Sequence, residues 1–170
     1  KVFSWLLSAA VLTSCSGFEV NEQTREELDI FPDYKGVTVP YNIAPLNFMT
    51  DCFAKGKVKV EASDGSALVC RMRNGKVCFP VRKWRALLES AKGATLTVTV
   101  MDNDSKAYEP FEISVAEEPV DRYIAYRLID PGYVLWNEMG IYQRDLESFR
   151  QRAVVENRDL DHACVNCHSF

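Results

Sequence analysis

Alternating hydrophobic and polar positions dominate the middle of the chain. In residues 57–62, valine and alanine alternate with lysine and glutamate, and in 95–100 leucine and valine alternate with threonine. Residues 111–116 repeat the pattern with Phe, Ile and Val. A period of two places one side of a strand in a core and the other in water, as in antiparallel sheets. The pattern therefore predicts several half-buried β-strands.

A hairpin and a helix complete this predicted region. Asn74-Gly75 lies between two apolar runs, which is a strong hairpin signal. Between Pro80 and Gly93 the apolar residues recur on one helical face. We therefore expect residues 31–119 to form a mainly β domain. It is an Ig-like or fibronectin-like β-sandwich with one packed helix.

The segment after the sandwich has a different pattern. Residues 120–129 read as a final strand or linker, and a helical pattern follows that is interrupted at Gly140. Region 120–170 is thus predicted to be a linker and a helical arm. The arm carries Arg144, Arg150, Arg152 and Arg158. Their forked guanidinium groups suit haem propionates, but for any one of them a solvated helix face with i, i+4 pairs is the favoured interpretation.

The N-terminus reads KVFSWLLSAAVLTSC, with one basic residue, an apolar run and small residues before Cys15. This arrangement is typical of a signal peptide over 1–15. Leu12-Thr13-Ser14-Cys15 resembles the lipobox of bacterial lipoproteins, which implies that Cys15 is acylated after cleavage. An ordinary secretory signal is the alternative. Residues 16–30 are polar and acidic and predict a flexible tether.

The C-terminal motif is Cys164-Val165-Asn166-Cys167-His168. Random placement of six Cys and two His predicts roughly 0.002 copies of C-x-x-C-H, so chance is a poor explanation. In c-type haem attachment both thiols, Cys164 and Cys167, form thioethers with the porphyrin, and the imidazole of His168 ligates the iron. Covalent haem c is therefore the expected cofactor.

Three other chemistries use such a cluster. His162 can complete a four-ligand zinc site, the two thiols can form a redox dithiol, or they can be an ordinary disulfide or free thiols. An exported protein lies in an oxidising compartment, which disfavours zinc on reduced thiols. We expect His162 not to be the distal ligand of a haem. Met139 is a weak candidate, and a residue beyond Phe170 is a better one, because we expect the natural chain to continue.

Three cysteines remain, Cys52, Cys70 and Cys78. A three-residue hairpin loop, 73–75, would place Cys70 opposite Cys78 and permit a disulfide. A two-residue Asn74-Gly75 turn would instead place them on opposite faces. The oxidising compartment favours the three-residue loop, and the alternative is two small apolar residues without a bond.

Composition excludes other classes of function. The net charge of −4 gives no basic field for nucleic acid. The sequence holds no Gly-rich phosphate loop, no G-x-S-x-G and no H-E-x-x-H, which argues against an enzyme.

The stretches 39–48, 126–146 and 154–170, together with the lipobox, resemble a family of Bacteroidetes lipoproteins. Its members are often labelled TolB-like or cytochrome c biosynthesis proteins, and a β-propeller follows their single CxxCH. The resemblance implies lipidation of Cys15 and haem ligation by the motif.

These observations predict a membrane-anchored c-type haem lipoprotein of the bacterial envelope, in the outer membrane or facing the periplasm. It would serve in electron transfer or redox sensing, with a redox or envelope protein as partner. A non-enzymatic lipoprotein that binds a peptide, glycan or protein is the first alternative. A haem peroxidase whose active residues lie beyond Phe170 is the second.

Overall fold

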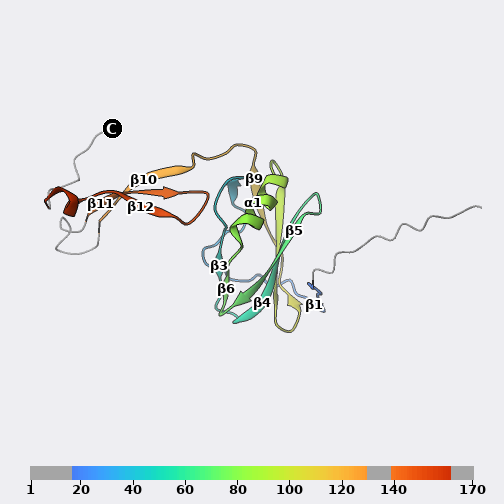
Figure 1. Cartoon of the computed structure of the whole chain (residues 1–170). Coiled ribbons are helices and arrows are strands. Elements are labelled where there is room, and N and C mark those ends of the chain that lie inside the picture. Colours follow the sequence, from blue (N-terminus) through green and yellow to red (C-terminus); the bar gives the residue numbers. More distant parts are fainter. Residues whose placement is uncertain (1–16, 130–138, 162–170) are drawn as a thin grey trace, which may run out of the picture.

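Two separately paired groups of strands make up the protein (Figure 1). The computed structural model describes residues 17–129 and 139–161. The first group is the β-domain, and its elements are β1 (Glu22–Gln23), β2 (Thr38–Pro40), β3 (Phe48–Met49), β4 (Lys55–Ala62), β5 (Ala67–Arg73), β6 (Lys76–Val77), α1 (Val81–Ser90), β7 (Thr95–Asp102), β8 (Lys106–Ala107) and β9 (Phe111–Ala116). The second group is the arm, with β10 (Tyr123–Leu128), β11 (Gly140–Asp145), β12 (Gln151–Glu156) and the 3-10 helix η1 (Asn157–Leu160).

The predicted fold class is confirmed: the protein is mainly β, consistent with a β-sandwich with one packed helix. The nine strands of the β-domain are linked by hydrogen bonds, and β4, β5 and β7 are at its centre. Val58 of β4 pairs with Cys70 on one side and with Val100 on the other. Strands β3 and β9 are not hydrogen-bonded neighbours, but they meet across the core, where the rings of Phe48 and Phe111 lie 6.2 Å apart.

The alternation seen in the sequence determines which side chains are buried. In β4 and β7 every second residue points inward, and Val58, Val60, Leu96 and Val98 have almost no exposed surface. Their intervening lysines, glutamate and threonines lie on the outer face. Burial of apolar area on this scale is the main term that stabilises a domain.

Helix α1 covers the core, as its apolar face predicts. Pro80 precedes it with extended backbone, and Gly93 follows it in the left-handed region at φ 69°. Trp84 is buried, and its ring stacks on Phe79 with centroids 5.0 Å apart. Trp84 is thus a core residue, as expected.

The predicted helical arm is wrong where the structure describes it, over residues 139–156, and the stretch 130–138 lies outside the described residues. Residues of β11 and β12 form an antiparallel hairpin, and β10 adds a third strand from Tyr123↔Asp145 to Leu128↔Gly140. Apolar β-branched and aromatic residues such as Ile141, Tyr142 and Val155 favour strands, and β10 gives β11 a second partner. These pairings outweigh the weak helical pattern.

The predicted tether is too long. Residues Glu22 and Gln23 pair with β8, and Leu28 and Ile30 are buried in the core of the β-domain. Two apolar residues spaced by two are enough to hold a polar segment against a hydrophobic surface. The folded domain therefore begins near Glu22 rather than Phe31.

The predicted three-residue hairpin loop is also wrong. Arg73 pairs with Lys76, so the turn contains only Asn74 and Gly75. Both have positive φ, 50° and 72°, which a two-residue type I′ turn requires. A Cβ on Gly75 would also come within 2.3 Å of the carbonyl oxygen of Thr50, so glycine is required there.

Candidate functional site

Most predicted site residues lie outside the described part of the chain. These are Cys15, His162, Cys164, Cys167 and His168. The structure does describe the arm that leads to the motif, and its last residue, Asp161, lies three positions before Cys164. In Figure 1 the arm projects from one end of the β-domain.

Tyrosines fix the three strands of the arm to one another. The rings of Tyr126 and Tyr142 stack with centroids 6.4 Å apart, and the Tyr142 hydroxyl donates to Glu156 Oε1 at 2.7 Å. The Tyr126 hydroxyl bonds Gln151 on β12. Side chains therefore join strands that backbone pairing alone would hold weakly, since small isolated sheets are marginal in water.

The end of the arm is held by a tight set of hydrogen bonds. The Asn157 amide donates to the Met139 carbonyl at 3.1 Å, and Asp159 Oδ2 accepts from the Glu156 amide at 3.0 Å. Asn157 is only 2% exposed and Met139 5%. This anchors η1, from which the chain continues toward Cys164. Met139 therefore lies next to the turn that leads to the motif, and its assignment as a distal ligand stays a prediction.

Three of the four arginines singled out in the sequence have partners within the arm. Arg150 contacts Asp145, Arg152 Nε donates to Gln143 Oε1 at 2.7 Å, and Arg158 pairs with Glu156. The fourth, Arg144, is exposed on β11. These contacts favour local pairing over a haem propionate role for the three partnered residues.

Asp145 is the polar centre of the β11–β12 turn. Its side chain is 6% exposed, and its carboxylate accepts from Arg122 Nη2 at 3.3 Å, from Ser148 Oγ at 2.9 Å and from the Glu147 amide at 3.1 Å. The Arg122 guanidinium, with these two donors, lowers the pKa of Asp145 from 3.8 to about 2. Burial opposes this shift, so the hydrogen bonds dominate.

The same turn joins the arm to the β-domain. Asn42 bonds both backbone groups of Val120, with each donor–acceptor distance 2.9 Å. The Ala44 amide donates to the Leu146 carbonyl at 2.7 Å, and Arg85 of α1 pairs with Glu147 at 3.3 Å. The arm thus has a defined attachment at the end of the β-domain that carries α1.

The hairpin cysteines lie on opposite faces in the observed register. Cys70 is buried and Cys78 is exposed, and both are free thiols, as is the exposed Cys52. Burial raises the pKa of the Cys70 thiol, which disfavours its reactive thiolate form. The structure gives no support to the disulfide that the three-residue loop would have allowed.

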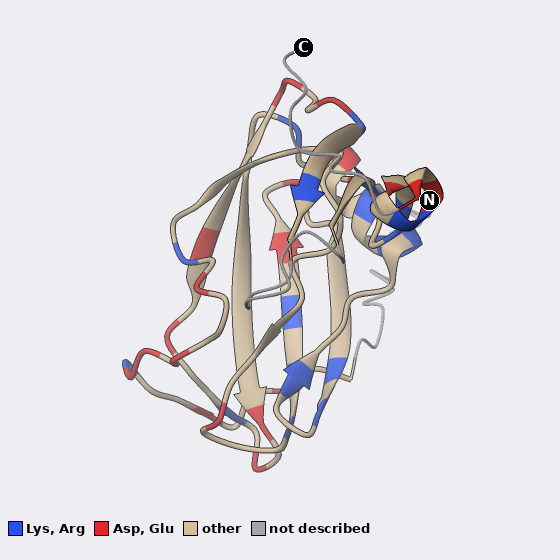
Figure 2. Ribbon diagram, turned by 90° about the vertical axis from the view of Figure 1, so that its left-hand side faces the viewer, with Lys and Arg blue, Asp and Glu red and all other residues tan. Residues whose placement is uncertain are grey.

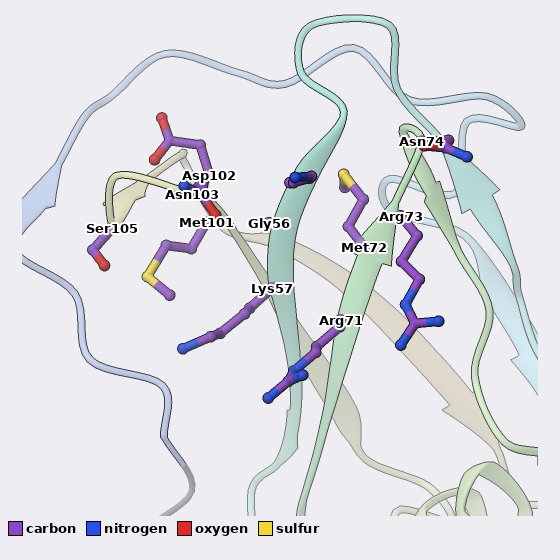
Figure 3. A pocket seen from close by; sticks show the side chains of 11 residues that line it. Gly56, Lys57, Arg71, Met72, Arg73, Asn74, Met101, Asp102, Asn103 and Ser105 are labelled. Atoms are coloured by element: carbon purple, nitrogen blue, oxygen red, sulfur yellow. The ribbon is translucent and has the colours of Figure 1, made fainter.

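Sequence analysis missed a pocket on the outer face of the β-domain. It has a volume of about 530 Å³. Its lining residues come from β4, β5, the β5–β6 turn, the end of β7 and the β7–β8 turn, and they are Lys55, Gly56, Lys57, Arg71, Met72, Arg73, Asn74, Met101, Asp102, Asn103 and Ser105. Figure 3 shows Lys57 and Arg71 extending side by side, with Asn103 and Ser105 across from them. The signal was a run of basic residues at alternate positions, at the start of β4 (Lys55, Lys57) and at the end of β5 (Arg71, Arg73).

Glycine at position 56 shapes this pocket. A Cβ there would lie 2.3 Å from the Met101 carbonyl oxygen and 3.0 Å from Cε2 of Phe53. The backbones of β4 and β7 therefore approach closely only because residue 56 has no side chain. The lining of the pocket combines two methionines with four basic side chains.

Within residues 17–129 and 139–161, no group of three or more His, Cys, Asp or Glu side chains is arranged to hold a metal ion. The helices of this part of the chain are too short or too polar to span a bilayer. No protein-family model, curated protein or solved structure matches the chain.

Proposed function

We propose that this protein is a membrane-anchored lipoprotein that carries one covalently attached haem c and uses it for electron transfer or redox sensing in the bacterial envelope. The observation that carries the proposal is the sequence Cys164-Val165-Asn166-Cys167-His168. Two thiols three positions apart suit two thioether bonds along one porphyrin edge, and the adjacent imidazole suits the iron. This donor set fits haem c better than zinc, which would need His162 as a fourth ligand and thiols kept reduced in an oxidising compartment.

The geometry of the arm supports the proposal. A redox centre that exchanges electrons with a partner has to be held where the partner can reach it. Figure 1 shows the arm projecting from the β-domain, and η1 closes the described part of that arm just before the motif. The hydrogen bonds of Asn157 and Glu156 hold η1 in place. The β-domain then acts as the base from which the arm presents the cofactor.

A haem stain tests the proposal. We expect the full chain, exported by a bacterium that has a cytochrome c maturation system, to give a haem-stained band that survives denaturing electrophoresis. The variant Cys164→Ser/Cys167→Ser should lose the band entirely. A matched control, Cys52→Ser/Cys78→Ser, removes two exposed thiols of the β-domain and should keep it. Normal staining of the Cys164/Cys167 variant would refute haem attachment.

His168 tests the second role of the motif. In His168→Ala the thioether bonds can still form, so we expect the stained band to remain while the absorption spectrum of the iron changes. A spectrum identical to that of the unsubstituted protein would exclude His168 as the axial ligand. A filled sixth iron position would favour electron transfer, and an open one would favour the peroxidase alternative.

A further inference from the structure

The outer surface of the β-domain carries cations that face one another across neighbouring strands. Lys55 pairs with Arg73 and Lys57 with Arg71, and Arg73 also pairs with Lys76. We call these five residues the basic face. Figure 2 colours lysine and arginine blue and shows blue segments on strands of the sheet. Like charges directly opposite one another destabilise a sheet. The fold itself gains nothing from this arrangement.

The basic face has no acidic partners within the described residues. None of its five side chains forms an ion pair there, although the chain carries a net charge of −4. Lys59, on the same strand, does pair with Glu61 at 2.7 Å. Asp102 lines the pocket, but its Oδ1 accepts from the amides of Asp104 and Lys106 at 2.9 and 3.0 Å. The positive charge is therefore open to an external anion.

The start of the described chain lies against this face. Lys57 Nζ donates to the Gly17 carbonyl oxygen at 2.5 Å, and the Asn21 amide donates to the Ser105 carbonyl at 3.0 Å. Cys15 is only two residues before Gly17. A lipid attached to Cys15 would then enter the membrane close to the basic face, because two residues span at most about 7 Å.

We propose that the basic face docks on the anionic phospholipid headgroups of the membrane that holds the protein. This rests on the proposed function in one respect, the lipid at Cys15, which brings the face to the membrane. Each Lys or Arg near an anionic bilayer strengthens binding by about fivefold. The arm leaves the β-domain at its other end in Figure 1, beside α1, so docking would turn the arm away from the membrane.

Vesicle binding tests the proposal without the lipid anchor. The full chain with Cys15→Ser cannot be acylated, and its binding is measured by co-sedimentation with phosphatidylcholine vesicles with and without phosphatidylglycerol. We expect binding to require phosphatidylglycerol and to weaken with added salt. Equal binding to both vesicle types would overturn the proposal, because it would reflect insertion of the apolar N-terminus rather than charge.

Two charge-matched variants of that chain locate the contact. Arg71→Gln/Arg73→Gln removes two charges of the basic face and should weaken binding about 25-fold. Arg82→Gln/Lys83→Gln removes two exposed charges of α1 and should change it less than about twofold. An equal loss of vesicle affinity in both variants would mean that only net charge matters, and it would overturn the proposal. Saturable binding of inorganic phosphate without binding to the vesicles would overturn it as well.

The vesicle experiment and the haem-stain experiment can fail independently of each other. A haem-stained, acylated protein whose vesicle binding ignores Arg71 and Arg73 would refute the basic face alone. Charge-dependent vesicle binding by a chain whose natural form carries neither lipid nor haem would refute the proposed function and leave the face intact. Stability provides a further check: since the replaced cations repel their neighbours, Arg71→Gln/Arg73→Gln should not lower the melting temperature. A clear drop would give these residues a structural role instead.

Discussion

The β-domain and the arm are both built from antiparallel strands, but different forces hold them. In the β-domain, buried valines, leucines and aromatic residues from helix α1 and most of the strands form one hydrophobic core. In the arm, the buried side chains among the described residues are Met139, Asp145 and Asn157, two of which are polar. Tyr123, Ile124, Leu128 and Val154 stay substantially exposed. Burial of apolar side chains therefore stabilises the β-domain, whereas hydrogen bonds and ion pairs stabilise the arm.

The largest effect is expected from removing a core side chain. Leu88 of α1 has no exposed surface, so Leu88→Ala should lower the free energy of unfolding by about 2–5 kcal/mol. The same change at the exposed Leu128 of the arm should cost no more than about 0.5 kcal/mol. Urea unfolding of both variants measures these two changes in the free energy of unfolding. Similar losses would mean that the arm shares an apolar core, and the comparison would fail.

The sequence predicts the β-domain better than the arm, for the same physical reason. The strands around Val58 and Val98 could be predicted because each has one buried and one wet face, which leaves a period of two in the sequence. The arm has little buried surface to impose such a period. Its strands depend on the pairing of Tyr126 with Tyr142, residues that come together only in the folded chain. Local pattern therefore favoured a helix that the tertiary pairing excludes.

The hairpin register shows a different failure. Asn74-Gly75 itself favours a two-residue turn, and the structure has that turn. The compartment argument for a disulfide outweighed this local signal and gave the wrong register. The basic face was missed for a related reason, since Lys55 and Arg73 become neighbours only once the register is known. The haem motif stays a prediction from sequence, because Cys164, Cys167 and His168 lie outside the described residues.

The second effect is confined to the arm and depends on pH. The folded-state pKa of Asp145, about 2, is below its ordinary value of 3.8, mainly because of Arg122. The stability that this carboxylate contributes is complete above about pH 5 and is lost as the pH falls toward 2. Pepsin cleavage within 139–161 should therefore accelerate severalfold over that window, while the β-domain stays intact.

Substitution makes this prediction specific. Asp145→Asn cannot titrate and loses the charge that Arg122 binds, so its arm should be cleaved rapidly at every pH in the window. Asp121→Asn changes an exposed carboxyl beside the arm and should behave like the unsubstituted protein. If Asp145→Asn resisted pepsin as well as the unsubstituted protein at pH 4, the polar centre would not be what holds the arm.

The smallest effect is expected from the ion pair at the junction of the two regions. Arg85 and Glu147 form a partly exposed ion pair, so Arg85→Ala should lower the free energy of unfolding by less than about 1 kcal/mol. Asn42→Ala should cost more, about 1–3 kcal/mol, because it leaves both backbone groups of Val120 without their partner. Distances between spin labels on α1 and β12 measure the arm's position directly. We expect the distribution of these distances to broaden in Asn42→Ala and to stay narrow in Arg85→Ala. The reason is that water competes less with neutral hydrogen bonds in the partly buried junction than with an exposed ion pair. Broadening in Arg85→Ala alone would reverse that order and make the surface ion pair the main link between β-domain and arm.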